Sequence, residues 1–260
     1  MPDISQARVR VGAVDVWAVS ESGLADHVVE AWRRSAGGAI VTANVDIVRA
    51  ATRRPELAAL IAESEVVVAD GMPVVWAGRL AGVPVPERVT GSSLVFTLAA
   101  AAAREGRSVY LLGGNPGVPE KAADVLTARH PGLRVAGTGS PPFGFERDDA
   151  LTAETVAGVV EATPDLVMVG LGFPKQENLI RLLRAELPDA WFLGCGAGIP
   201  MAAGEFTRAP GVVQKVGAEW LHRLALEPRR LAKRYLRDDL PFAFRLLGGA
   251  LRTRFRRTGE

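Results

Sequence analysis

The strongest constraint on the fold is a repeating unit of a short apolar run, a loop and an amphipathic segment. In the clearest example, the β-branched run Val66–Ala69 breaks at Asp70-Gly71, and Pro73 follows in the first turn of a predicted helix. Further apolar runs of this kind occupy residues 39–42, 108–112, 165–169 and 190–193. Strand-like and helix-like segments that alternate with short loops predict βαβ units and a parallel sheet.

The loops after these strands are expected at a single edge of the sheet, because crossovers between parallel strands are right-handed. They are Thr42–Asn44, Asp70–Pro73, Gly113–Gly117, Gly172–Glu177 and Gly194–Gly198. Open α/β sheets bind their ligands at the carboxyl ends of the strands. Four of the five loops contain glycine, which lets backbone N–H groups approach a ligand closely. The sequence therefore predicts a Rossmann-like, mostly parallel sheet with flanking helices and a ligand site at this edge.

Composition narrows the class of protein. The chain has 260 residues, a net charge of +2, three histidines and a single cysteine, Cys195, so no internal disulfide and no metal site are expected. The first twenty residues lack the apolar core of a signal peptide. No run reaches the roughly eighteen uncharged apolar residues of a membrane span. We expect a globular protein of a reducing compartment that contacts a membrane, if at all, at its surface.

Polar side chains at two strand ends are candidate ligand contacts, and each also has a structural interpretation. Asp70 is a carboxylate at the predicted ligand edge, or the cap of the helix that follows Gly71. Thr42 and Asn44 offer hydroxyl and amide groups suited to a sugar or nucleoside, or they bond locally within a turn. Spacing alone leaves both interpretations open for these residues.

Later motifs add further candidates. Lys175 can neutralise a phosphate and Gln176 can donate to a sugar or base, although Pro174 to Glu177 also suits a capped helix start. Arg88 can pair with a diphosphate, or with Glu87 at the surface. The glycine loops that contain Gly71, Gly113, Gly114 and Gly172 offer backbone donors at predicted helix starts, and these glycines are candidate substrate contacts. Gly113–Gly117 lacks the full dinucleotide fingerprint, and its alternative interpretation is a tight turn. A helix is expected over Ser92–Arg104.

The C-terminal segment differs from the rest of the chain. From Val216 onward, apolar and basic residues alternate at helical spacing, and the basic excess continues to Arg257. Such segments lie on anionic membranes or bind nucleic acid, and the structural alternative is a solvated helix face. We therefore expect a core over residues 1–210 and a small basic helical appendage over residues 211–260.

Several motifs together resemble the WecG/TagA/CpsF glycosyltransferase family, from about Ala39 to Tyr235. The motifs that carry the resemblance are Thr42 and Asn44, Ala69-Asp70-Gly71 with Pro73, Arg88-Val89-Thr90-Gly91, Leu112-Gly113-Gly114, Gly170 to Glu177, Arg208-Ala209-Pro210, Glu219-Trp220-Leu221 and Arg234-Tyr235. In this family a sugar, typically N-acetylmannosamine, its uronic acid or a hexose, moves from a UDP-sugar to a polyprenyl-diphosphate-linked acceptor. The resemblance implies an inverting enzyme of cell-surface polysaccharide synthesis that uses no cofactor or metal.

The resemblance also implies roles for individual residues. Asp70 would be the catalytic base, and Thr42, Asn44, Arg88 and Gln176 would line the donor pocket. Arg223 and Arg230 of the appendage would bind the diphosphate. It places the protein in the cytoplasm, on the inner face of the plasma membrane, with an anionic membrane surface as partner and no nucleic acid. It leaves a homo-oligomer possible.

Two positions depart from the family pattern, and two other functions compete with it. Ser92-Ser93 stands where members often carry an acid after R-V-x-G, and Ile199-Pro200 stands where they often carry an aspartate. These changes bear on which sugar is used. The competing functions are an NAD(P)-dependent oxidoreductase and a non-catalytic protein that binds nucleotides or nucleic acid. The first predicts an acid after the strand that ends near Gly137, where the chain has Gly-Thr-Gly.

Overall fold

The computed structural model describes residues 7–205 and 237–257. The main sheet contains β3 (Gly38–Ala43), β4 (Val66–Ala69), β5 (Ser108–Gly113), β6 (Arg134–Gly139), β7 (Leu166–Gly170) and β8 (Trp191–Gly194). All six strands are parallel, in the order β4-β3-β8-β7-β5-β6. The predicted Rossmann-like α/β fold is confirmed. The inner strands are apolar and buried on both faces, as parallel sheets require.

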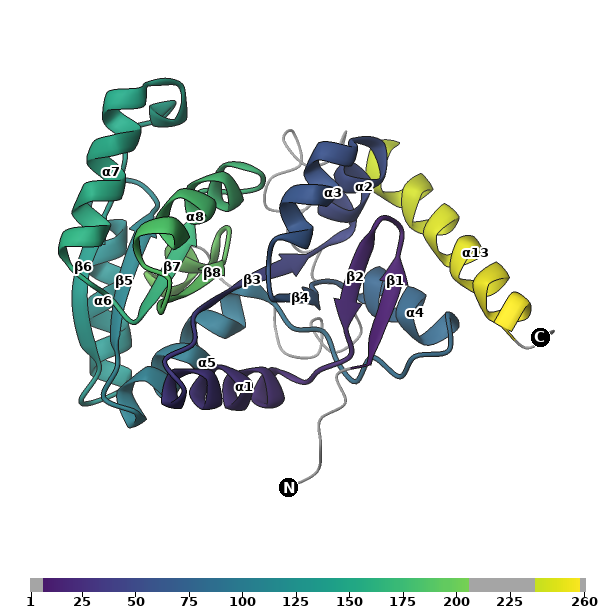
Figure 1. The fold of residues 1–260 in the computed structure, drawn as a ribbon, viewed down its shortest axis with the longest axis horizontal. Helices are drawn as coiled ribbons and strands as arrows, with labels where there is room; N and C mark the ends of the chain where they lie inside the picture. Colours follow the sequence, from purple (N-terminus) through teal and green to yellow (C-terminus); the bar gives the residue numbers. More distant parts are fainter. Residues whose placement is uncertain (1–6, 206–236, 258–260) are drawn as a thin grey trace.

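Helices cover both faces of this sheet (Figure 1). They are α1 (Glu21–Arg33), α2 (Val45–Arg53), α3 (Pro55–Ala62), α4 (Met72–Leu80), α5 (Gly91–Arg104), α6 (Val118–Arg129), α7 (Asp149–Glu161), α8 (Lys175–Glu186), α9 (Gly198–Ala202) and α13 (Leu240–Arg257), with a short 3-10 helix, η1 (Phe145–Arg147). The core of one face joins α1, α5, α6 and α9, and that of the other joins α7 and α8. The expected helix at Ser92 begins instead at Gly91, because the side chain of Thr90 caps it by accepting from Ser93 N–H.

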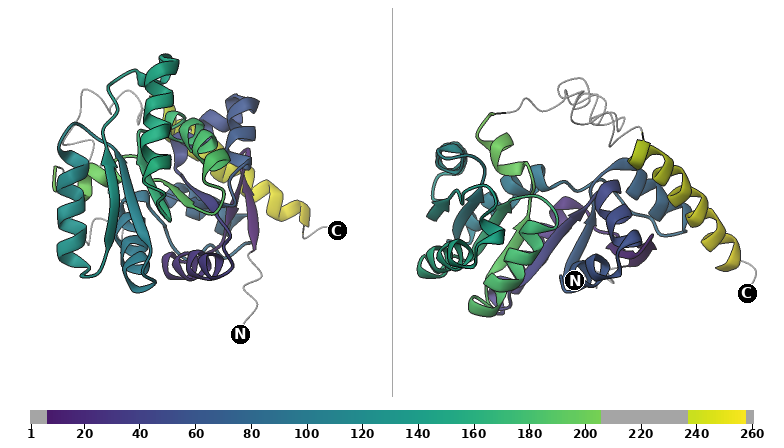
Figure 2. Two further views of the ribbon diagram at one scale, coloured as in Figure 1. Left: turned by 60° about the vertical axis from the view of Figure 1, so that its left-hand side comes forward. Right: turned by 90° about the horizontal axis from the view of Figure 1, so that it is seen from above.

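An antiparallel hairpin of β1 (Arg8–Val11) and β2 (Val14–Trp17) lies beyond the β4 end of the sheet. Its valines share a core with α2, α3 and α4 and with Leu246 of α13. Figures 1 and 2 show α13 beside α4, at the opposite end of the molecule from β6 and α6. The described part of the C-terminal segment therefore packs on the β4 end of the sheet.

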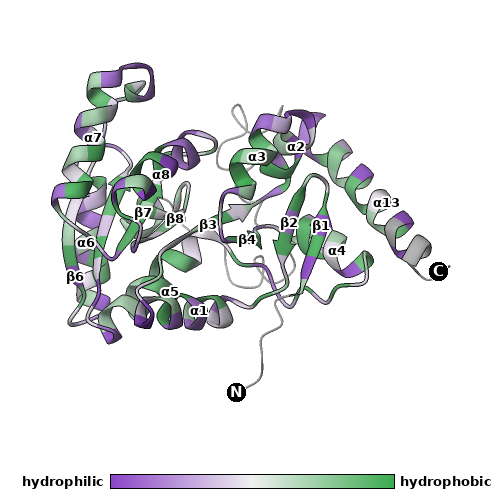
Figure 3. Ribbon diagram, in the orientation of Figure 1, coloured by the Kyte–Doolittle hydropathy of each residue, from purple (hydrophilic) through white to green (hydrophobic). Residues whose placement is uncertain are grey.

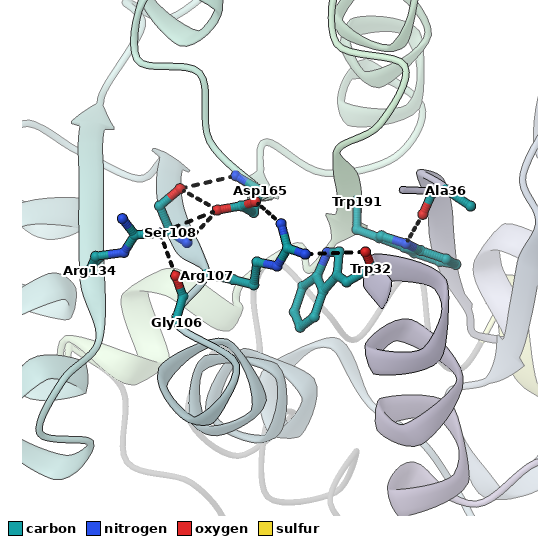
Figure 4. A network of polar contacts seen from close by, with 8 residues as sticks. All are labelled: Trp32, Ala36, Gly106, Arg107, Ser108, Arg134, Asp165 and Trp191. Carbon is teal, nitrogen blue, oxygen red and sulfur yellow. Dashed lines mark hydrogen bonds and ion pairs between the residues drawn. The ribbon is translucent and has the colours of Figure 1, made fainter. Parts of the chain in front are cut away.

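The amino edge of the sheet is held by a polar network centred on Asp165, just before β7 (Figure 4). Its carboxylate accepts from the Ser108 N–H at 2.7 Å, the Ser108 hydroxyl at 2.8 Å and the Arg107 guanidinium at 2.9 Å. Arg107 also donates to the Trp32 carbonyl at the end of α1. The network ties β5, β7 and α1 together, which fixes the strands whose opposite ends form the candidate site.

Candidate active site

The loops after β3, β4, β5, β7 and β8 meet at the carboxyl edge, because the strands are parallel. The connection after β3 leads to α2, and that after β8 leads to α9, whose side chains belong to the core of the other face. Neighbouring strands whose connections leave toward opposite faces form a crevice at their carboxyl ends, which is where α/β folds bind ligands. The sequence-predicted ligand edge thus contains a switch point between β3 and β8.

Asp70 follows β4 directly and lies at this edge, half-buried. Its N–H donates to the Ala43 carbonyl at 3.0 Å, which extends the pairing of β3 and β4 by one residue. The cap position of α4 is taken by Gly71, whose φ of 122° is unfavourable for other residues. Asp70 is therefore the residue before the cap, and its backbone continues β4 toward the ligand edge.

Arg88 is brought to the same strand end by the backbone. The N–H of Val89 donates to the Ala69 carbonyl at 2.9 Å, so the segment runs alongside the end of β4. The Glu87 carboxylate accepts from the Glu21 N–H at 2.7 Å, at the start of α1. The fold thus places a half-buried guanidinium residue next to the strand that carries Asp70.

Thr42 and Asn44 both make the local bonds that their structural interpretation predicts. The Thr42 hydroxyl is buried and donates to the Gly194 carbonyl at 3.2 Å, which joins the ends of β3 and β8. The Asn44 side-chain oxygen accepts from the Ile47 N–H at 3.0 Å and caps α2. Asn44 is exposed, and its amide nitrogen is a donor that the cap does not use. Asn44 can therefore serve a ligand and a helix together.

Close packing accounts for two of the glycines at the carboxyl edge of the sheet. A side chain at Gly113, where φ is 123°, would place its Cβ 2.5 Å from the Gly170 carbonyl oxygen of the neighbouring strand. Gly114 has a φ of 92° and lies against Val118. Gly172 has a φ of 78° with open space around it. Gly71, also predicted to contact the substrate, has only Pro73 Cδ near the position of a Cβ, at 3.9 Å. Of the four predicted glycines, Gly71 and Gly172 are therefore the two whose surroundings leave room for a ligand.

Lys175 is neutralised by an acid from another loop. Its ammonium group lies 2.5 Å from a carboxylate oxygen of Glu146 and 4.9 Å from the centre of the Phe143 ring, which is almost fully exposed. The hydrogen bond from Lys175 holds the pKa of Glu146 below its ordinary value. A phosphate would have to compete with this carboxylate. Sequence reasoning missed Phe143 and Glu146, although their glycine- and proline-rich loop follows a strand and so belongs to the same edge.

Gln176 is buried, and its amide joins two loops. The side-chain oxygen accepts from the Gly172 N–H at 3.1 Å and from the Gly196 N–H at 3.2 Å. The side-chain nitrogen donates to Glu177 at 2.9 Å. Burial raises the pKa of Glu177 to about 7, since the bonds from Gln176 and its own backbone only partly offset the loss of solvation. Gln176 was predicted to contact the donor; here its amide connects the loops after β7 and β8.

Two further expectations concern a metal site and two arginines of the C-terminal segment. Within residues 7–205 and 237–257, no three His, Cys, Asp or Glu side chains are grouped so that they can hold a metal ion. Arg223 and Arg230, predicted to bind a diphosphate, lie outside the described residues. The candidate site therefore consists of the five loops and the edge residues above.

The sequence matches the profile of the glycosyl transferase WecG/TagA/CpsF family over residues 9–256. The chain belongs to this family. It is also 30% identical over 194 residues to a curated N-acetylglucosaminyldiphosphoundecaprenol N-acetyl-beta-D-mannosaminyltransferase of Bacillus spizizenii. That match covers 75% of this chain and 73% of the relative. The resemblance found from the motifs is confirmed.

Membership of the WecG/TagA/CpsF family makes the chain a sugar-transferring enzyme and supports a UDP-sugar donor. It displaces the two competing functions, an oxidoreductase and a non-catalytic binding protein. Among the described helices of this glycosyltransferase, none is long and apolar enough to cross a membrane. The roles of Asp70 and the donor-pocket residues stay predictions.

Proposed function

We propose that this glycosyltransferase moves N-acetylmannosamine from a UDP-sugar to a polyprenyl-diphosphate-linked N-acetylglucosamine, in the synthesis of a cell-surface polysaccharide or teichoic acid. The name of the Bacillus spizizenii relative supports this acceptor and this sugar. The uronic acid of N-acetylmannosamine and a hexose remain the alternative donors. The differences at Ser92-Ser93 and Ile199-Pro200 bear on that choice.

Asp70 is the proposed catalytic base, and its place at the end of β4 beside the Arg88 segment carries the proposal. The Asp70 carboxylate accepts the proton of the acceptor hydroxyl. The hydroxyl oxygen attacks the anomeric carbon from the face opposite UDP, the new C–O bond forms, and the bond to the diphosphate breaks with its electron pair leaving on UDP. A positioned carboxylate base contributes roughly a hundred- to ten-thousandfold in rate. The product has inverted configuration.

The leaving diphosphate gains negative charge and needs donors around it. Arg88 and the backbone N–H groups of the glycine loops are suited to supply them, and Asn44 has an amide nitrogen available for the sugar or nucleoside. Arg223 and Arg230 are proposed to complete the diphosphate contacts. Thr42 and Gln176 contribute by fixing β8 and its loop.

The test is acceptor-dependent UDP release with a panel of UDP-sugars and a short-chain polyprenyl-diphosphate-N-acetylglucosamine. Wild type is compared with Asp70→Asn and with Asp189→Asn, the same change at an exposed site of the amino edge. We expect Asp189→Asn to match wild type and Asp70→Asn to lose turnover while it still binds UDP. Near-wild-type turnover of Asp70→Asn would refute the base assignment, and no release with any UDP-sugar would refute the donor class.

The proposed membrane contact rests on the outer face of α13. Phe244 and Leu251 are exposed there, together with Arg245 and Arg252. Figure 3 shows apolar and polar residues alternating along this helix. Exposed aromatic and aliphatic groups among arginines fit an anionic lipid surface, which supports the proposed location at the inner face of the plasma membrane.

The membrane contact is tested by sedimentation with phosphatidylglycerol vesicles. The double variant Phe244→Ser with Arg245→Gln should pellet several-fold less than wild type. Leu182→Ser, which removes an exposed leucine from α8, is the matched control and should pellet like wild type. Unchanged pelleting of the double variant would show that this face does not bind lipid.

A further inference from the structure

Glu177 is an acid buried at the candidate site with one carboxylate oxygen unused. Its side chain is 4% exposed. Oε1 accepts from the Gln176 amide nitrogen at 2.9 Å, and Oε2 has no hydrogen-bond partner among the described residues. Folded proteins pair nearly all buried polar atoms, so an unpaired one calls for an explanation. The reaction proposed above gives this carboxylate no chemical step.

The Gln176 amide makes its contacts in only one of its two orientations. Its oxygen must face the N–H groups of Gly172 and Gly196, because the amide nitrogen there would set donor against donor. The nitrogen then points at Glu177, and a carboxylate can only accept. Glu177 therefore selects the orientation in which Gln176 joins the loops after β7 and β8.

The cluster sits at the crevice between β3 and β8. A Cβ on Gly194 would lie 2.7 Å from the Gln176 amide nitrogen and 3.3 Å from Glu177 Oε1, so both side chains cover the end of β8. The carbonyl of Gly194 accepts from Thr42 on the other side. A change at Glu177 thus reaches loops that are proposed to contact the donor.

We propose that Glu177 is a positioning residue for the donor site, which holds the Gln176 amide and through it the Gly172 and Gly196 loops. This inference rests on the proposed function. The ionised carboxylate makes the stronger, charge-assisted bond to Gln176. Protonation weakens that bond and loosens the two loops, so the donor affinity follows the charge on Glu177.

The pKa of Glu177, about 7, places this change near neutral pH. Burial, the bond from Gln176 and its own backbone set this pKa. Three ion pairs connect α8 to neighbouring segments, while Glu186 of α8 and Asp149, Glu154 and Glu161 of α7 are exposed and in no ion pair with the described residues. These pairs are Lys175 with Glu146, Arg181 with Glu63, and Arg184 with Glu65. Glu177 differs from these acids because it is buried.

The test follows the amide resonances of Gly172 and Gly196 from pH 5.5 to 8.5 in the full-length protein, alongside donor KM and kcat. The variants are Glu177→Gln, which keeps an acceptor without a charge, and Glu177→Met, which removes the acceptor. The control is Glu186→Gln, the same change at the exposed end of α8.

In wild type and Glu186→Gln, both amides should shift with a common midpoint near pH 7, and donor KM should rise several-fold below it. Glu177→Gln should lose the midpoint and show, at every pH, the raised donor KM that wild type reaches below the midpoint. Glu177→Met should raise donor KM at least fivefold with a smaller change in kcat.

Absence of the midpoint in wild type, or its survival in Glu177→Gln, would overturn the inference, and the wild-type titration decides even if a variant does not fold. A wild-type donor KM in Glu177→Met would overturn it as well. Wild-type protein that shows the midpoint but transfers no sugar would refute the proposed function instead, and with it the donor-site role, while the Glu177–Gln176 coupling would stand.

Discussion

The carboxylates of two acids at opposite edges of the sheet differ in how fully they are hydrogen-bonded. At the amino edge, Asp165 accepts three hydrogen bonds from Arg107 and Ser108 (Figure 4). At the carboxyl edge, Glu177 accepts from Gln176 and leaves one oxygen unpaired. The first arrangement favours the charged form, and the second disfavours it. The polar groups around Asp165 are arranged to stabilise the fold, whereas Asn44 and Glu177 at the carboxyl edge retain hydrogen-bonding capacity that their contacts within the fold do not use.

Because of this difference, the two acids change the stability of the fold over different pH ranges. Burial alone would raise the pKa of Asp165, but the bonds from Ser108 and Arg107 outweigh it and the pKa lies below the ordinary 3.8. Its stabilising contribution is therefore present above pH 3.8 and is lost as the pH falls through the folded-state pKa. The pKa of Glu177 is raised from 4.5 to about 7, so the folded state loses stability as the pH rises from 4.5 to 7.

The largest expected effect is on turnover at the carboxyl edge. Asp70→Asn should lower kcat roughly a hundred- to ten-thousandfold, because the base is lost, and should leave the urea unfolding midpoint unchanged. Stopped-assay kinetics and urea titration check the two halves. If Asp70→Asn lowered the urea unfolding midpoint and kept its kcat, Asp70 would have a structural role, and the proposed difference between the two edges would be wrong.

The amino edge should show the reverse pattern. Asp165→Ala leaves the Ser108 N–H and the Arg107 guanidinium without their acceptor. We expect a loss of roughly 2–4 kcal/mol in the free energy of unfolding, with kcat of the folded protein within about twofold of wild type. Urea unfolding and kinetics at low temperature measure both. A large fall in kcat of fully folded protein would contradict the division of roles.

A smaller and opposite effect is expected at Glu177. Glu177→Gln removes a buried charge, so the free energy of unfolding should rise at pH 8 by roughly 1–3 kcal/mol relative to wild type and should change little at pH 4.5. Urea titrations at the two pH values measure this difference. An equal effect at both pH values would mean that ionisation of Glu177 is not involved.

The smallest effect is expected at Gly194. A methyl group there would push the Gln176 amide aside, since its Cβ would lie 2.7 Å from the amide nitrogen. We expect Gly194→Ala to raise donor KM about two- to fivefold and to destabilise by roughly 1 kcal/mol. Gly158→Ala is the control, because nothing lies within 4 Å of that position on α7, and it should stabilise by roughly 0.5–1 kcal/mol. Equal donor KM values for the two variants would show that Gly194 does not influence donor binding.

Much of the fold and part of the site could be predicted from local sequence. The β-branched runs, the glycine and proline breaks and the helical spacing determined the strands, the helices and the edge to which Asp70, Thr42 and Asn44 belong. The identity of the capping residue was harder, since Thr90 and Ser92 are both suitable and the backbone at Thr90 decides between them. Local propensities act over a few residues, and they are enough to order the elements.

The sequence by itself determined an α/β sheet with a ligand edge and a carboxylate after β4. Only the tertiary structure decided which polar residues at that edge remain available to a ligand. Lys175 meets Glu146 from a different loop, and Gln176 turns inward to Gly196 and Glu177. These partners are distant in the chain or depend on burial, so no local pattern encodes them. The Gln176 contacts form when the ends of β7 and β8 come together, the Lys175 contact when the connection after β6 reaches the start of α8, and desolvation raises the pKa of Glu177.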